Sequence, residues 1–441
     1  MTPPPPICEA APAARLSLGP SHASVGVPMR GSFWRKLIAF TGPGYIVAVG
    51  YMDPGNWATD LAGGSRYGYA LLWVIVASSL MAMLLQALSA KLGIVTGLDL
   101  AQACREHYPR PVRLALWLVA EIAIVACDLA EVVGTAIALL LLFGLPLPVG
   151  VCLTSINVIV AILLERRGFR KLEVLVGGLV MTVAVALGCE LLLSHPDVQS
   201  IASGLVPSAG ILRDPDMLFI ATGIIGATVM PHNLYLHSAV VQTRRYPRDS
   251  DGRREAIRFA TLDSMIALGA AMLINAAILI LAGSVFHPRG RAVEDIAEAY
   301  HLLSPMLGAG AASLLFAIAL LASGQNSTLT GTLAGQVVME GFTDLRMPLW
   351  ARRAVSRAIA IVPAMLIAIS YGSAGTAKLL IASQVILTLQ LPFAIVPLVL
   401  LTARRKIMGE FASSRLLTGT ASVVACLIIG MGAKLLFDLA G

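Results

Sequence analysis

The most prominent pattern in the sequence is a series of long, nearly continuous apolar runs separated by short polar stretches. A membrane-spanning helix needs about 20 apolar residues at about 1.5 Å rise per residue, and these runs have that length. A membrane β-barrel would show short segments of alternating polarity instead, so we expect an all-α integral membrane protein. Eleven spans are predicted, at 37–62, 69–97, 114–143, 147–164, 173–194, 217–242, 261–286, 303–325, 354–371, 378–402 and 416–438.

The first and sixth runs are interrupted by residues that are unfavourable in a membrane helix. The first contains Asp53–Pro54–Gly55–Asn56 and the sixth contains Met230–Pro231–His232–Asn233. Asp is costly at the bilayer centre, and Pro breaks the backbone hydrogen-bond ladder. Adding 177 to the residue number carries Asp53 onto Met230, and likewise Gly50 onto Ala227. Because the two interruptions are five spans apart, the second unit is inverted relative to the first, and such a pair indicates a substrate site at the midplane.

Composition and charge support a membrane protein and predict its orientation. Of the residues, 57% are apolar and 13% are charged, and the mean hydropathy is +0.81. In soluble domains about a quarter of the residues are charged. The net charge of +7 does not indicate nucleic-acid binding, because Lys and Arg gather in alternate loops, at 166–171, 244–258, 346–353 and 404–406. This positive-inside pattern predicts a cell (inner) membrane protein with a cytoplasmic N-terminus and an external C-terminus.

The expected organisation follows from these runs. Residues 1–33 are predicted to be a disordered cytoplasmic tail, since they cannot bury enough surface to offset the entropy of ordering. The remaining divisions are a first five-helix repeat at 34–194, an external connection at 195–216, a second, inverted five-helix repeat at 217–402, and an eleventh helix with the C-terminus at 403–441.

The third predicted span carries three acids, Glu121, Asp128 and Glu131. Spacings of seven and ten residues are close to two and three helical turns, so the three carboxylates share one face. A lipid-facing stripe of acids is too costly, and the face must look into the bundle or toward water. Structural ion pairs with Arg352 and Arg353, or a proton or ion relay, are both compatible with the pattern.

The two interruptions also bring together donors for a cation. Unwound backbone frees carbonyl groups, which a membrane tolerates only in a protein interior or along a cavity. Carbonyls near Gly50 and Ala227, with the Asp53 carboxylate and the Asn56 amide oxygen, would suit Na⁺, Ca²⁺ or Mg²⁺. The thioether of Met230 is a soft ligand that favours Mn²⁺, Fe²⁺, Co²⁺ or Cd²⁺, although a methionine can also serve as apolar filling.

Other polar residues in the apolar runs leave more than one interpretation open. His232 titrates near neutral pH without perturbation, so we assign it a proton role and leave His237 undetermined. The lone amides Asn275 and Gln384 can serve as ligands or as hydrogen-bond partners of a neighbouring helix. The small and hydroxyl residues at 322–332, at the end of the eighth predicted span, suit close helix packing.

The quoted segments carry a family resemblance. Asp53–Asn56 and Met230–Ser238 resemble the signatures of the natural resistance-associated macrophage protein (Nramp) family of divalent-metal transporters, and Gly324–Thr332 is similar to that family's transport motif. The resemblance covers nearly everything after about residue 33, and the bacterial proton-coupled manganese transporters are the nearest branch. It implies a LeuT-like fold of two inverted five-helix repeats plus an eleventh helix, with the first and sixth helices broken mid-membrane.

The resemblance also implies roles for particular residues. The implied metal ligands are Asp53, Asn56, Met230 and the carbonyl near Ala227, with the carbonyl near Gly50 and the side chain of Gln384 approaching in some conformations. The implied proton route passes through His232, Glu131 and Asp128 towards Arg353 and Arg352, with Glu121 nearby.

The expected function is therefore secondary active import of Mn²⁺, and of other divalent transition metals such as Fe²⁺, coupled to proton entry by alternating access. We expect no cofactor, no enzymatic activity and no nucleic-acid partner, with the metal ion, protons and the lipid bilayer as partners and a monomer sufficient for function. One alternative is a carrier of an organic solute on the same fold. An intramembrane metalloenzyme would need a motif such as His-Glu-x-x-His or Gly-x-Ser-x-Gly, which does not occur, and a metal sensor would need an output domain.

Overall fold

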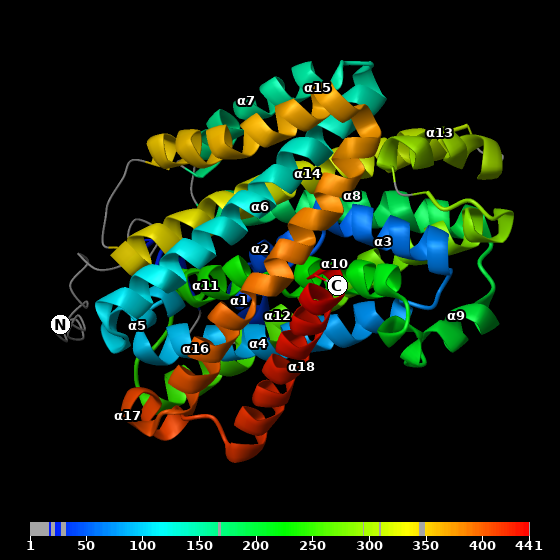
Figure 1. Cartoon of the computed structure of the whole chain (residues 1–441). Helices are drawn as coiled ribbons and strands as arrows, with labels where there is room; N and C mark the ends of the chain where they lie inside the picture. Colours follow the sequence, from blue (N-terminus) through cyan, green and yellow to red (C-terminus); the bar gives the residue numbers. More distant parts are fainter. Residues whose placement is uncertain are drawn as a thin grey trace.

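A computed structural model of the chain describes residues 17–18, 23–27, 32–165, 169–293, 295–307, 310–343 and 349–440, nearly all of them helical (Figure 1). The first elements are β1 (Val25–Gly26), α1 (Phe33–Phe40), α2 (Pro43–Gly50), α3 (Pro54–Tyr67), α4 (Leu72–Thr96), α5 (Leu100–His107), α6 (Arg110–Phe143), α7 (Leu147–Glu165), α8 (Phe169–Ser194), α9 (Val198–Gly204) and η3 (Ala209–Leu212). The remaining elements are α10 (Pro215–Val229), α11 (Pro231–Val240), η4 (Val241–Thr243), β2 (Arg244–Arg245), α12 (Ser250–Val285), η5 (His287–Arg289), α13 (Ile296–Leu307), α14 (Ala312–Thr343), α15 (Leu349–Gln390), α16 (Pro392–Ala403), α17 (Arg405–Met408), η6 (Gly409–Phe411) and α18 (Arg415–Ala440).

The helical segments confirm a multi-pass membrane protein. Within the described ranges, nine segments are long and apolar enough to cross a membrane. Two of the expected spans fall outside that set for different reasons. The first is divided into α2 and α3, and the fourth, α7, has only a shorter apolar helix at Leu147–Ile156 among its described residues. The count of eleven therefore stays a prediction.

The predicted boundaries of the eighth span are wrong. The predicted eighth span, 303–325, straddles the end of α13 and the start of α14, and α14 continues to Thr343. The polarity of 322–332 suggested a helix end, but the side chains there are small, and nearly all of them are buried within the bundle. The predicted gap between the ninth and tenth spans is confirmed: Gly372, with φ 60° and ψ −147°, is non-helical and separates two helices within α15. The two spans are Ala354–Gly372 and Gly375–Ala403, the second of which continues into α16.

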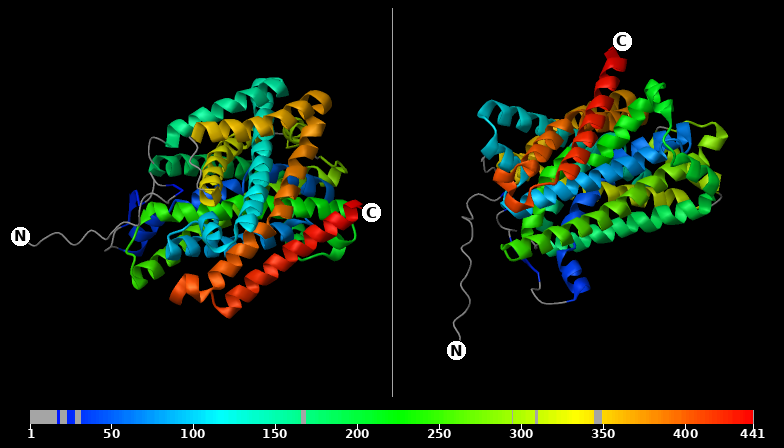
Figure 2. Two further views of the ribbon diagram at one scale, coloured as in Figure 1. Left: turned by 60° about the vertical axis from the view of Figure 1, so that its left-hand side comes forward. Right: turned by 90° about the horizontal axis from the view of Figure 1, so that it is seen from below.

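The helices form one bundle with the two broken helices inside it. Helix α6 packs along both α14 and α15, and α3 packs against α10 and α12. Helix α18 lies along one edge of the bundle, where it contacts α10 and α16 (Figures 1 and 2). The elements that carry the candidate site residues are thus the ones surrounded by other helices.

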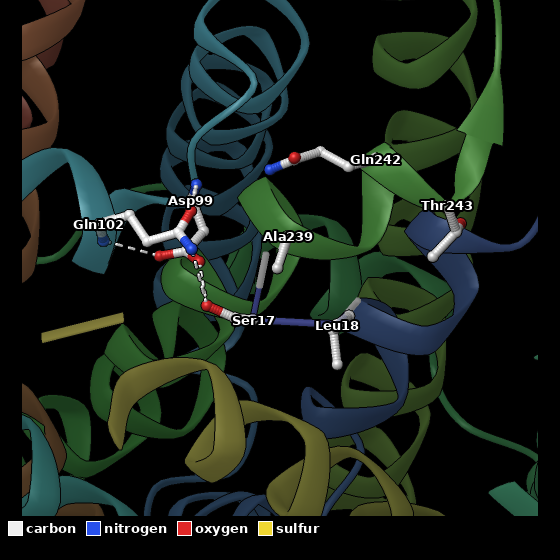
Figure 3. Close-up of a pocket in the computed structure, with 7 residues that line it drawn as sticks. All are labelled: Ser17, Leu18, Asp99, Gln102, Ala239, Gln242 and Thr243. Carbon is white, nitrogen blue, oxygen red and sulfur yellow. Dashed lines mark hydrogen bonds between the residues drawn. The ribbon is translucent and has the colours of Figure 1, made fainter. Parts of the chain in front are cut away.

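Part of the N-terminal tail is ordered. Val25–Gly26 forms a short parallel strand with Arg244–Arg245, and the predicted disorder of residues 1–33 does not extend to it. The Ser17 hydroxyl donates a hydrogen bond to the carboxylate of Asp99 at 2.6 Å, and the Gln102 amide donates one to Ser17 Oγ at 3.2 Å (Figure 3). These contacts hold the segment against the end of α4 and the start of α5.

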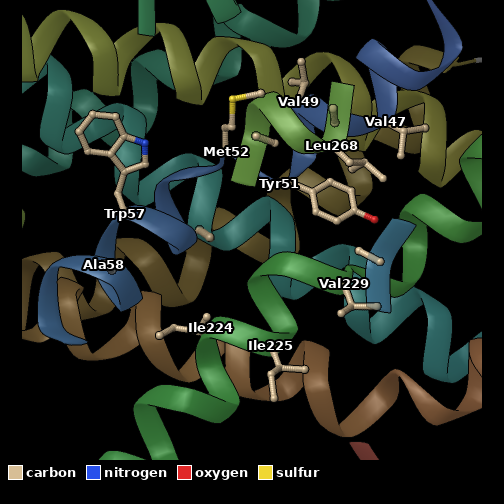
Figure 4. Close-up of a cluster of buried hydrophobic side chains, with 14 of the residues drawn as sticks. Val47, Val49, Tyr51, Met52, Trp57, Ala58, Ile224, Ile225, Val229 and Leu268 are labelled. Carbon is tan, nitrogen blue, oxygen red and sulfur yellow. The ribbon is translucent and has the colours of Figure 1, made fainter. Parts of the chain in front are cut away.

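Apolar packing holds the first broken helix in place. Tyr51 and Met52, between α2 and α3, are both buried. Figure 4 shows them within a cluster that includes residues of α10 and α12. The ring of Trp57 packs edge-on against Phe316 of α14, with ring centroids 5.0 Å apart. The break is therefore enclosed by side chains from several helices and is not exposed to lipid.

Candidate functional site

The first helix break lies between Gly50, the last residue of α2, and Pro54, the first of α3. Asp53 caps α3: its Oδ1 accepts a hydrogen bond from the Asn56 backbone N–H at 2.8 Å, as expected for an N-cap carboxylate. The other oxygen, Asp53 Oδ2, and the amide oxygen of Asn56 have no hydrogen-bond partner among the described residues. Both side chains are buried, so two oxygen atoms point into the interior unpaired.

The second break lies at Met230, between α10 and α11. Its φ of 26° is unusual for a residue other than glycine, and such strain is concentrated at functional sites. Pro231 has no N–H to donate to the carbonyl four residues earlier, that of Ala227. The same reasoning applies to Pro54 and Gly50, although the Gly50 carbonyl accepts a hydrogen bond from the Asp53 N–H at 3.2 Å. Pro231 thus leaves the Ala227 carbonyl without its helical donor, whereas the Gly50 carbonyl exchanges its helical donor for the Asp53 N–H.

The two breaks meet in space. A Cβ placed on Gly50 would lie 3.2 Å from Met230 Sδ, so the thioether lies beside the first break. The side-chain amide of Asn233 donates to the Val47 carbonyl at 3.3 Å and contacts Met230 Sδ at 3.5 Å, which joins α11 to α2. The two half-helices are therefore held together at the point where each is interrupted.

Gln384 of α15 completes this group. Its side chain packs so closely on Gly55 that an added Cβ there would collide with it. Its Nε2 donates to Ser383 Oγ at 3.1 Å, and its Oε1 has no partner in the described part of the chain. The structure thus places Met230 of α10–α11 beside Gly50 and Gln384 of α15 beside Gly55, so that residues from three parts of the chain line the first break, where Asp53 and Asn56 are buried.

The gathered atoms are of mixed character: one carboxylate, two amide oxygens, backbone carbonyls and one thioether. No group of three or more His, Cys, Asp or Glu side chains suited to a metal ion occurs within the described ranges. A cation here would be held by neutral oxygens and sulfur with a single carboxylate. Such a set differs from the closed His and Cys cages of structural metal sites.

The two histidines of α11 have different surroundings. His232 is buried, and its Nδ1 has no partner among the residues described. His237 lies between the Gln86 side chain at 3.0 Å and Ser264 Oγ at 3.2 Å, and the amide of Gln86 also donates to the Tyr51 hydroxyl at 2.7 Å. His237 is thus fully engaged in linking α4, α11 and α12, whereas His232 retains an unpartnered ring nitrogen.

The acids of α6 face the bundle interior, as expected, and two of them form ion pairs. Arg352 lies 3.1 Å from Glu121, which confirms the predicted partner of that acid. The buried Glu131 lies 3.5 Å from Arg357, and Arg357 also donates to the Asp128 carbonyl at 3.3 Å. The predicted involvement of Arg353 is not settled, since its side chain lies outside the described residues.

Arg357 is the residue that the sequence analysis missed. It lies inside the predicted ninth span, and an arginine inside an apolar span is itself a signal of function. Glycines of α14 provide the space for these charged groups: Gly331 faces Glu131 and Asp128, and Gly335 faces the guanidinium of Arg352. The small residues resembling a transport motif therefore pack against the acids of α6.

Comparison with known proteins places this geometry in a family. The model of the Nramp family, described as natural resistance-associated macrophage protein-like, matches residues 44–438. A protein named divalent metal cation transporter MntH from Xanthomonas campestris pv. campestris is 57% identical over 99% of this chain and 98% of its own.

Solved structures agree with this match. A manganese transporter of Eremococcus coleocola is similar, with a TM-score of 0.88 and 43% identity over 95% of this chain and 90% of its own. Mhp1, a nucleobase-cation-symport-1 family transporter, is similar in fold, with a TM-score of 0.62 at 15% identity over 96% of this chain and 94% of its own. The expected LeuT-like fold is thereby confirmed, and the chain belongs to the Nramp family of membrane transporters, which are not enzymes.

Proposed function

We propose that this protein imports divalent transition-metal ions, Mn²⁺ foremost and Fe²⁺ among others, by alternating access with proton entry. The observation that carries the proposal is the meeting of the two helix breaks: unpaired oxygens of Asp53 and Asn56 are buried at the first break, and the Met230 thioether of the second break lies beside Gly50. Buried polar atoms without partners are costly, and an incoming cation would satisfy them. The relatives named as divalent metal cation and manganese transporters support the same substrate class.

The choice of ion rests on the mixed donor set. Mg²⁺ prefers a rigid octahedron of oxygens and retains its water, whereas a thioether helps borderline transition metals. The carbonyls of Ala227 and Gly50 and the amide of Gln384 would complete the shell as the half-helices move. A negative-inside potential would assist entry, because each charge gains about 2.3 kcal/mol per 100 mV.

Protons would take a neighbouring route. His232, Asp128 and Glu131 would carry them away from the metal, with Arg357, Arg352 and Arg353 along the path and Glu121 nearby. The ion pairs of Glu121 and Glu131 support this assignment because each acid has a cation that stabilises its charged form. A separate route also avoids placing a proton and a divalent ion in one narrow site.

The proposed setting is a bacterial inner membrane with α1 at the cytoplasmic side and α9 outside, by the positive-inside pattern of the loops. On this assignment, residues 34–194 and 217–402 form the two inverted repeats, and 403–441 adds the eleventh helix. A single chain is expected to suffice for transport.

The deciding experiment is Mn²⁺ uptake into proteoliposomes at fixed membrane potential, with and without an inward proton gradient, with excess Mg²⁺ offered and internal pH read simultaneously. Uptake that resists Mg²⁺ and acidifies the lumen is expected. Asp53→Asn should abolish it, while Glu410→Gln, at an exposed surface ion pair, serves as the control. Uptake without acidification would remove the proton route, and no uptake would favour the organic-solute carrier.

A further inference from the structure

Asp60 is a buried acid of α3 that the mechanism above does not use. Its side chain is 1% exposed, and its Oδ2 has no hydrogen-bond partner among the residues that the structure describes. Its sequence position is seven residues beyond Asp53 and four beyond Asn56. In an α-helix these spacings place all three residues on one face, with Asp60 about 6 Å along the axis from Asn56.

Among the residues that the structure describes, no Lys, Arg or His pairs with Asp60. Residues of α3 on either side of Asp60 pack against neighbouring helices, since Thr59 meets Gly223 of α10 and Gly64 meets Leu279 of α12. The basic residue of α3, Arg66, pairs with Asp216 at the far end of the helix. A carboxylate buried without a cation is unfavourable, so the site requires either a proton or a bound ion.

A second oxygen favours the ion. Asn56 Oδ1 lies one helical turn away on the same face and is likewise buried and unpartnered within the described ranges. A carboxylate oxygen and an amide oxygen without donors are ligands of the kind that divalent cations bind.

Along α3, Asp60 lies between a cavity at one end of the helix and the first helix break at the other. The far end of α3 borders a cavity of about 640 Å³, which is lined by Tyr67, Gly68, His195, Asp197 and His287 among others. Asp60 is seven residues from Tyr67 and seven from Asp53, and is therefore midway along α3 between the cavity and the first break. An ion that enters from the cavity side along this face would meet Asp60 before Asp53.

We propose that Asp60 and Asn56 Oδ1 form a second, outer binding position for the divalent cation, from which Asn56 hands the ion to Asp53. This inference rests on the proposed import function. The outer position holds the ion by one carboxylate and one amide oxygen without the thioether, so it captures divalent cations with little selectivity, and selection takes place at Met230.

The first test is Mn²⁺ uptake by Asp60→Asn. We expect its KM for Mn²⁺ to rise about tenfold while the maximal rate changes less than twofold, because the inner site is intact. Asp60→Glu, which keeps the charge, should restore most of the affinity. The matched control is Glu190→Gln in α8, since Glu190 is also fully buried and neither of its carboxyl oxygens has a partner in the described part of the chain. An Asp60→Asn KM equal to that of wild type would overturn the proposal.

A binding measurement keeps the test valid if Asp60→Asn does not fold. Asp53→Asn protein, with Asp60 present, should still bind one Mn²⁺ weakly, seen as loss of the free-Mn²⁺ signal in electron paramagnetic resonance titrations. Absence of this residual binding would overturn the outer site. Failure of the import proposal looks different, because wild-type protein would then neither bind nor transport Mn²⁺.

Discussion

Gly134 of α6 lies directly against Pro54, the residue that starts α3 after the first break. A Cβ on Gly134 would collide with both Cβ and Cγ of the proline ring. Helix α6, which carries the acids of the proposed proton route, therefore packs directly against the proline ring at the first helix break. This contact requires a residue without a side chain at position 134.

Gly134→Ala should therefore push α3 away from α6. We expect a loss of about 1–3 kcal/mol in the free energy of unfolding, as for overpacked cores, together with reduced Mn²⁺ uptake. Thermal unfolding in detergent and liposome uptake measure the two effects. Gly178→Ala in α8 is the control, because nothing lies within 4 Å of an added Cβ there. Equal behaviour of the two variants would contradict the close contact.

Met230→Ala should alter selectivity more than transport itself. Without the thioether the remaining donors are oxygens, so Mg²⁺ and Ca²⁺ should compete better while Mn²⁺ uptake persists. A shift of about tenfold in the ratio of apparent affinities, equivalent to about 1.4 kcal/mol, is expected in competition assays. Met181→Ala, at an exposed position of α8, should leave the ratio unchanged. An unaltered ratio in Met230→Ala would show that the sulfur does not select the ion.

Removing one member of the Glu131–Arg357 pair should destabilise the protein strongly. Arg357→Met leaves the buried carboxylate without this cation, and such losses cost about 3–5 kcal/mol. The double variant Glu131→Gln/Arg357→Met should recover much of that stability, as measured by a double-mutant cycle. Breaking the exposed Arg254–Glu410 pair by Arg254→Met should cost only about 0–1 kcal/mol. Similar costs for the two arginines would argue against a buried ion pair.

His232→Ala should weaken proton coupling more than metal binding. The unpartnered Nδ1 of His232 is the feature on which this expectation rests. The ratio of lumen acidification to Mn²⁺ uptake should fall, while Mn²⁺ binding in detergent changes little. His301→Ala, at an exposed position of α13, is the control. Acidification traces identical to those of wild type would remove His232 from the proton route.

Asp99, which lies between α4 and α5, should make stability depend on pH. Burial raises the pKa of its carboxyl to about 6, against hydrogen bonds from Ser17 and Gln102 that lower it. Because the folded pKa exceeds the usual value near 3.9, the protein should lose stability as pH rises from about 4 through about 6. Asp99→Asn retains an N-cap acceptor and removes this loss, which is of the order of 2–3 kcal/mol.

The measurement is the unfolding midpoint of both proteins in detergent at pH 4.5 and pH 7.5. Relative to wild type, the variant should gain stability at the higher pH. A difference between the two proteins that is the same at both pH values would show that the carboxyl of Asp99 does not titrate in this range.

Much of the architecture and of the candidate site was predictable from local pattern. Apolar runs of membrane length identified most helices, and the prolines at 54 and 231 identified both breaks, because Pro has no N–H and cannot continue the ladder. The end of the eighth span was predicted wrongly since polarity alone was used. Small hydroxyl residues such as Thr328 can be buried inside a bundle when a neighbouring helix supplies polar groups, and α15 does so here through Arg357, which donates to the Thr328 hydroxyl at 3.3 Å.

By itself the sequence determined that this is a helical membrane protein with two interrupted helices, and which side chains stand at the interruptions. These properties follow from hydrophobicity, helical periodicity and proline chemistry, which are local. Only the tertiary structure decided that Met230 lies beside Gly50, that Gln384 covers Gly55, and that Arg357 pairs with Glu131. Those contacts join helices far apart in the chain, and they depend on how closely backbones approach in three dimensions, which no single segment encodes.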